Sequence, residues 1–128
     1  MTPELDKKLV EDFPILYQQR HSDMSITAMC WGFPGDGWEP LIRKLSEKIE
    51  TYNKENPGSP VIAVQVKEKF GGLRFYITGA PEWIHDLINK AENKSYTVCE
   101  MCGKPGEERS TGWILTLCDE CYQKRLQS

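Results

Sequence analysis

The chain has 128 residues, of which 27% are charged, and its formal net charge is −3 at pH 7. A chain of this length buries a real core without disulfide bonds, and it suits one domain that carries at most a small additional module. We expect a cytoplasmic protein, because no apolar run approaches a membrane span and the N-terminus does not resemble a secretion signal.

A helix is predicted near the N-terminus. Thr2 suits the N-cap, Pro3 suits the first helical position, and apolar side chains recur at helical intervals as far as Phe13. Pro14 interrupts this pattern, and we expect residues 15–20 to continue the helix after a kink.

The segment 31–38 (WGFPGDGW) combines three aromatic residues with three glycines and a proline. Aromatic residues on a loop are typical of protein interfaces, which makes Trp31, Phe33 and Trp38 candidate partner-binding residues. The alternative is that the loop packs back onto the hairpin as part of the core. The sequence leaves both interpretations open.

A second helix is predicted after this loop. Asp36 and Glu39 have the spacing of a capping box at its start, and Pro57 marks the point before which it should end. Its predicted apolar face consists of Trp38, Leu41, Ile42, Leu45, Ile49 and Tyr52.

A hairpin is predicted next. Residues 61–66 form a β-branched run, residues 73–78 alternate strictly, and Gly71–Gly72 suits the turn between them. The glycine pair also invites a phosphate-binding interpretation, but it lacks the spacing of the known phosphate loops, so a plain turn is favoured. The alternation predicts an inward set and an outward set of side chains: Leu73, Phe75 and Ile77 inward, and Arg74, Tyr76 and Thr78 outward.

The hairpin is a basic segment, with three positive charges against one negative charge in residues 61–78. Lys67, Lys69 and Arg74 lie among aromatic residues there, which is the best arrangement in the chain for contacting nucleic acid. Arg74 and Tyr76 on the outward face are also candidate partner-binding residues, since interfaces often use these residue types as anchors.

A third helix is predicted after Pro81. Because a two-stranded hairpin alone is marginally stable, the helices are expected to cover one of its faces. The sequence therefore predicts an α+β domain over residues 1–96. The apolar face of this third helix consists of Trp83, Ile84, Leu87, Ile88 and Ala91.

Two C-x-x-C pairs follow, Cys99 with Cys102 and Cys118 with Cys121, with fifteen residues between the pairs. This spacing matches the template of a zinc ribbon, and four sulfur ligands leave no open position on the metal, so we expect a structural zinc ion. A redox C-x-x-C or two unrelated pairs is the less favoured alternative.

The zinc ribbon is predicted over residues 97–128. A strand is expected over 111–117 and a helix over 119–126, and Gly103 allows the positive φ that follows the second ligand. The ribbon carries four basic side chains against five acidic ones, and bound zinc with four thiolates adds further negative charge, so nucleic-acid binding should be weak.

The fifth cysteine, Cys30, raises the possibility of an enzyme with a cysteine nucleophile. The chain has two histidines, His21 and His85, but the sequence brings neither of them near Cys30. A cysteine packed among neighbouring apolar side chains is the favoured interpretation. No acid/base pair of residues is evident, and we predict a protein that is not an enzyme.

Several stretches resemble a family of small uncharacterised proteins of bacteriophages and prophages. They are CWGF at 30–33, GDGW at 35–38, VQVKEKFGGLRFY at 64–76, CEMCGKPG at 99–106 and GWILTLCD at 112–119. The resemblance brings no known activity. It implies a phage accessory protein made in a bacterial cell, and such acidic proteins often bind and inhibit host proteins, including defence systems.

Two main functional hypotheses follow. The favoured one is a protein that binds a bacterial host protein through the 31–38 loop or the outward face of the hairpin. The alternative is a nucleic-acid-binding protein that uses Lys67, Lys69 and Arg74 in transcription or DNA handling.

Overall fold

The computed structural model describes residues 1–110 and 112–127. Thr111 and Ser128, which belong to the predicted strand 111–117 and the predicted ribbon 97–128, lie outside the described residues. Among the helices of the described residues, none combines the length and the apolar character that a membrane span requires. The elements are α1 (Pro3–Asp12), the 3-10 helices η1 (Met29–Trp31) and η2 (Asp36–Trp38), α2 (Glu39–Glu55), β1 (Ala63–Lys69), β2 (Gly72–Ile77), α3 (Glu82–Ser95), β3 (Glu107–Ser110), β4 (Ile114–Leu117) and α4 (Asp119–Leu126).

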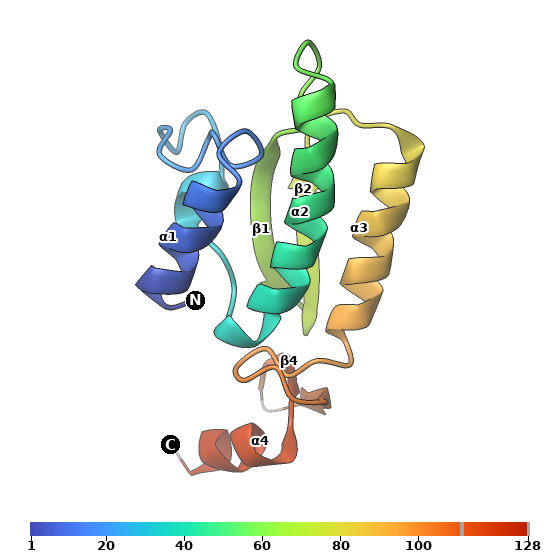
Figure 1. Cartoon of the computed structure of the whole chain (residues 1–128). Coiled ribbons are helices and arrows are strands. Elements are labelled where there is room, and N and C mark those ends of the chain that lie inside the picture. The colour runs from blue at the N-terminus through green and yellow to red at the C-terminus, as the bar shows by residue number, and fades with distance from the viewer. Residues whose placement is uncertain (111, 128) are drawn as a thin grey trace.

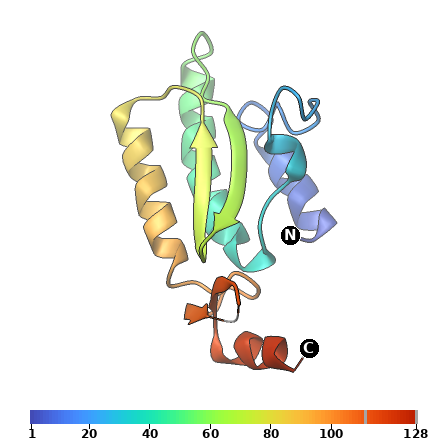
Figure 2. The same cartoon turned by 180° about the vertical axis from the view of Figure 1, so that it is seen from behind.

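The predicted α+β architecture is confirmed. β1 and β2 form an antiparallel hairpin, and α2 and α3 lie side by side over one of its faces, with α1 on the other side of α2 (Figure 1). Seen from behind, the opposite face of the hairpin is turned to the viewer, and no other described helix or strand crosses it (Figure 2). The C-terminal elements lie beyond the turn of the hairpin.

The core lies between the hairpin and the helices. Leu73 and Phe75 point inward and are buried, as predicted, and Ile77 packs against the same core while half-buried. Trp83 departs from the predicted helix face: its side chain is 49% exposed and packs edge-on against Tyr52, with ring centroids 5.8 Å apart.

Buried polar side chains of α2 hold the segment that follows α1. The Glu50 carboxylate accepts the backbone N–H groups of Ile15 and Leu16, at 3.0 and 2.9 Å. The amide of Asn53 bonds both the N–H and the carbonyl of Val61 in front of β1. Residues 14–21 therefore form turns, and the predicted continuation of the first helix is wrong, because these contacts replace helical hydrogen bonds.

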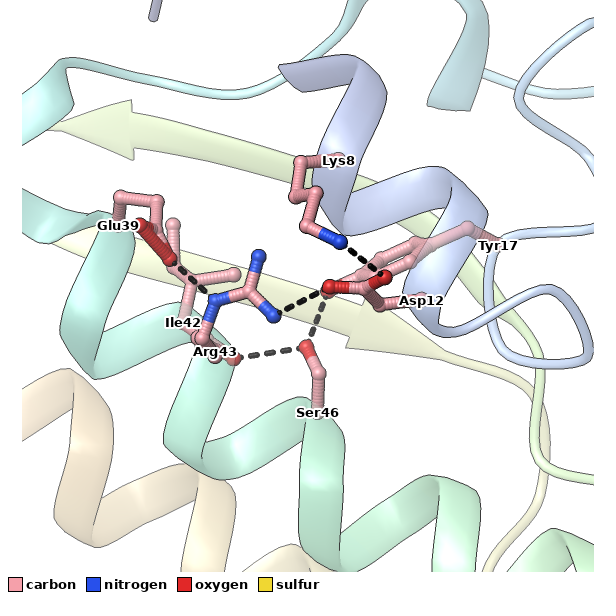
Figure 3. A network of polar contacts seen from close by, with 7 residues as sticks. All are labelled: Lys8, Asp12, Tyr17, Glu39, Ile42, Arg43 and Ser46. Carbon is pink, nitrogen blue, oxygen red and sulfur yellow. Dashed lines mark hydrogen bonds and ion pairs between the residues drawn. The ribbon is translucent and has the colours of Figure 1, made fainter. Parts of the chain in front are cut away.

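The network in Figure 3 joins α1 to α2. Arg43 donates to Asp12 and to Glu39, both at 2.8 Å, and Lys8 donates to Asp12 at 3.1 Å. The two cations lower the pKa of the Asp12 carboxyl. Beneath them the Tyr17 hydroxyl bonds Ser46 at 2.6 Å, and burial raises the pKa of Tyr17.

The predicted capping box is wrong. The Asp36 carboxylate accepts the backbone N–H of Thr2 at 2.6 Å, so it tethers the N-terminus, and Glu39 pairs with Arg43. α2 begins at Glu39, directly after the 3-10 turn η2, and ends at Glu55 before Pro57, as predicted.

The turn of the hairpin is one residue earlier than predicted. Lys69 pairs with Gly72, so the two loop residues are Phe70 and Gly71, whose φ angles are 54° and 85°. Two successive positive φ angles are the mark of a type I′ turn, which matches the twist of a hairpin. Gly72 is the first residue of β2, where the Tyr96 ring leaves no room for a side chain.

Candidate metal centre

Each C-x-x-C pair is held by a local backbone structure. Cys99 and Cys102 flank a tight turn that ends at Gly103, whose φ of 85° is the positive angle predicted from the sequence. Cys118 is the N-cap of α4, and its Sγ accepts the backbone N–H of Cys121 at 3.4 Å. Each pair thus directs its two sulfur atoms toward a common point.

The four sulfur atoms converge. All lie within 4.8 Å of one another, the Cys102 and Cys118 atoms are 3.5 Å apart, and the four residues are free thiols. Zinc–sulfur bonds of about 2.3 Å in a tetrahedron place sulfur atoms roughly 3.8 Å apart, so the cluster has the size of a metal site. No other group of three or more potential ligands gathers in the part of the chain that the structure describes.

The thiols of the cluster influence one another's acidity. The N–H of Cys121 lowers the pKa of the Cys118 thiol to about 7. Burial and the neighbouring thiols raise the pKa of Cys121 to about 12. Four thiolates at this spacing repel one another, and a bound cation would relieve that repulsion.

A short hairpin brings the second pair to the first. β3 pairs with β4 from Glu107 opposite Leu117 to Ser110 opposite Ile114. β4 confirms the predicted strand over Ile114–Leu117, but the prediction is wrong for Gly112 and Trp113, which form a bend. α4 agrees with the predicted helix, whereas β3 has no alternating pattern and was not predicted. The N–H of Glu100 in the first turn bonds the carbonyl of Thr116 in β4, at 3.0 Å.

The 31–38 loop docks on the first cysteine turn. The N–H of Gly37 bonds the carbonyl of Glu100 at 2.7 Å, and the indole N–H of Trp38 bonds the carbonyl of Val98 at 2.8 Å. The Glu100 carboxylate accepts the N–H of Gly35 at 3.0 Å, and burial raises the pKa of this carboxyl. A Cβ atom on Gly35 or Gly37 would overlap the carbonyl oxygens of this turn.

These contacts correct two of the predicted partner-binding residues. Trp38 is fully buried, and Phe33 is buried with its ring edge-on to Tyr17 at 4.9 Å. Neither residue is available to a partner, because both belong to the core. Trp31, in contrast, is 73% exposed. Gly35 and Gly37 were the signal in the sequence that this loop packs closely, because glycines between aromatic residues allow one backbone segment to approach another.

Two outward residues of β1, Gln65 and Lys67, lie close to Trp31. Gln65 pairs with Tyr76 and Lys67 with Arg74 across the strands, and the Lys67 ammonium lies 5.8 Å from the centre of the Tyr76 ring. Trp31, Gln65 and Lys67 line one hollow of about 230 Å³. We call these five residues, Trp31, Gln65, Lys67, Arg74 and Tyr76, the hairpin surface.

The basic residues of the hairpin differ in exposure. Arg74 is half-buried and donates to the hydroxyl of Tyr96 at 2.9 Å, which raises the pKa of its guanidinium. Lys67 is half-buried, and Lys69 is exposed beside Phe70 at the turn. The structure thus brings together Lys67 and Arg74, and Lys69 lies further along the strand.

Cys30 is half-buried, and its thiol donates to the carbonyl of Thr27 at 3.5 Å. Within the described residues, neither His21 nor His85 hydrogen-bonds to it.

Comparisons with protein-family models, with curated proteins and with solved structures found no significant match to this chain.

Proposed function

We propose that Cys99, Cys102, Cys118 and Cys121 hold one zinc ion per chain and that this zinc is structural. The convergence of four thiols without a disulfide supports this proposal. Four sulfur ligands suit zinc, and they complete a tetrahedral shell without a place for a reacting water molecule.

Metal analysis of the purified protein is expected to find one zinc per chain. Because zinc must displace protons from the thiols, its affinity should rise with pH and the ion should be lost on acidification. Replacing Cys118 with serine should abolish the bound zinc, whereas Cys30→Ser, outside the cluster, should retain it. A protein that carries no zinc after purification without chelators would contradict the proposal.

We further propose that the protein is a non-enzymatic phage accessory protein that acts in the bacterial cytoplasm by binding and inhibiting a host protein. The hairpin surface is the proposed contact. The observation that supports it is the grouping of two exposed aromatic side chains, Trp31 at 73% and Tyr76 at 41%, around Lys67. Trp31 belongs to η1 beside β1, and no other described helix or strand crosses the adjoining face of the hairpin (Figure 2). Aromatic and basic side chains are the usual anchors of protein interfaces.

The test is affinity capture from bacterial lysate with the zinc-loaded protein. Trp31→Ala with Tyr76→Ala should reduce the recovery of the captured host protein about tenfold or more. The melting temperature should change by no more than about 3 °C, because both side chains are at the surface. Trp83→Ala, an exposed tryptophan outside the hairpin surface, should leave recovery unchanged. Equal recovery with all three proteins would contradict the proposed contact.

The alternative function is nucleic-acid binding, which the cross-strand pair of Lys67 and Arg74 favours. With Lys69 it offers only three cations, so binding should be weak and should weaken further as salt is added. Nuclease treatment of the lysate separates the two functions. Capture through a protein interface should survive the treatment, whereas capture through bound nucleic acid should be lost. Nanomolar binding to duplex DNA at physiological salt would favour the alternative.

A further inference from the structure

The outer side of the helix pair carries a groove that the sequence did not reveal. α2 and α3 run side by side in opposite directions, with the hairpin behind them (Figure 1). The groove between them has a volume of about 170 Å³ and an apolar floor. Leu45 and Ala91 are buried in this floor, and Leu41 and Leu87 remain half-exposed.

Four lysines form the rim of this groove. Lys44 and Lys48 lie on α2, Lys90 and Lys94 lie on α3, and all four are exposed. Within the described residues, none of them takes part in an ion pair. We call the floor and the rim together the lysine groove.

The arrangement of these charges is unfavourable for the isolated chain. Lysines four residues apart on one helix face repel each other, and here two such pairs face one another across the groove. Lysine stems cover apolar surface while the ammonium groups stay in water, but the half-exposed Leu41 and Leu87 show that the floor is not fully covered. The groove therefore presents apolar contacts flanked by positive charge on both sides.

We propose that the lysine groove binds an acidic amphipathic helix of a protein partner. A helix laid along two antiparallel helices would place its apolar side chains on Leu41 and Leu87, and its carboxylates on either side would meet the four lysines. The groove follows α2 from Leu41 to Lys48, which is about 10 Å or two helical turns. It therefore suits a helix with an apolar stripe and Asp or Glu on both flanks.

The charge complementarity favours an acidic protein segment over nucleic acid. Phosphate groups would satisfy the lysines, but they would leave the leucine floor without contacts, and no aromatic side chain lines the groove for base stacking. The lysine groove lies on the opposite side of the hairpin from the hairpin surface. It is thus a second binding surface, and its test does not depend on the proposed function.

The test uses a synthetic peptide of about three heptads with leucine at the a and d positions and glutamate at e and g. Binding to the full-length, zinc-loaded protein is measured by fluorescence anisotropy, and the contacted methyl groups are mapped by NMR. We expect saturable binding that weakens with salt, with the methyl signals of Leu41, Leu87 and Ala91 shifting most. A peptide of the same composition in scrambled order should bind at least tenfold more weakly.

Two variants with equal changes in charge complete the test. Lys44→Glu with Lys90→Glu should weaken peptide binding at least tenfold, whereas Lys54→Glu with Lys124→Glu, away from the groove, should change it less than threefold. Circular dichroism should show both variants folded. Failure of the peptide to bind, shifts that map elsewhere, or equal losses in both variants would overturn the proposal. A single-stranded oligonucleotide that competes fully with the peptide would overturn it in favour of nucleic acid.

Discussion

Removal of zinc by a chelator is expected to unfold residues 97–127 and to expose Trp38, while the α+β domain stays folded at lower stability. The ribbon has only a small apolar cluster around Leu117, so its fold should depend on the metal. The domain keeps its own core between the hairpin and the helices.

The loss of stability follows from hydrogen bonds between the two parts. Trp38 bonds Val98, Gly35 and Gly37 both bond Glu100, and the Thr116 hydroxyl donates to the carbonyl of Gly71 at 2.6 Å. At about 1 kcal/mol for each bond, the loss of these four bonds should destabilise the domain by about 4 kcal/mol. The indole of Trp38 should also become exposed to solvent, because in the folded protein the first cysteine turn covers it.

The measurement uses a variant in which Trp38 is the only tryptophan and the other three are replaced by phenylalanine. Chelation should shift its emission to longer wavelength and increase quenching by acrylamide, and added zinc should reverse both changes. The helical signal in far-ultraviolet circular dichroism should largely remain. Unchanged Trp38 emission would show that the ribbon does not cover this residue, and complete loss of helix would show that the domain cannot fold alone.

Among glycine-to-alanine substitutions in the 31–38 loop, Gly37→Ala is expected to reduce the stability of the protein most. Its Cβ atom would overlap the carbonyl oxygen of Cys99 and the backbone nitrogen of Gly103, and neither can yield as the end of a flexible side chain would. We expect a loss of about 3 kcal/mol, which corresponds to a fall in melting temperature of roughly 10 °C. The affinity for zinc should fall as well, because Cys99 is a proposed ligand.

Gly58→Ala provides the matched control. Gly58 is exposed between α2 and β1, and a Cβ atom there would meet nothing within 4 Å. Its melting temperature should stay within about 2 °C of the unchanged protein. Thermal unfolding and zinc release are measured on both variants. If Gly37→Ala were as stable as Gly58→Ala, the close approach of the loop to the cysteine turn would not contribute to stability.

The features that the sequence determined by itself are local ones. Helical spacing placed α2 and α3, strict alternation assigned Leu73 and Phe75 to the core, and the spacing of the cysteines predicted their cluster. In each case the residues involved are close in the chain or share one regular period, so the pattern can be read without knowledge of the packing.

The remaining features depend on contacts between distant segments. The buried Glu50 decided that residues 15–20 form turns, and contact with Val98 decided that Trp38 belongs to the core rather than to an interface. The lysine groove arises in the same way: Lys44 and Lys90 lie on two helices that are separated by the whole hairpin in sequence. Packing both helices on one face of the hairpin brings these charges together, and neither helix alone contains that information.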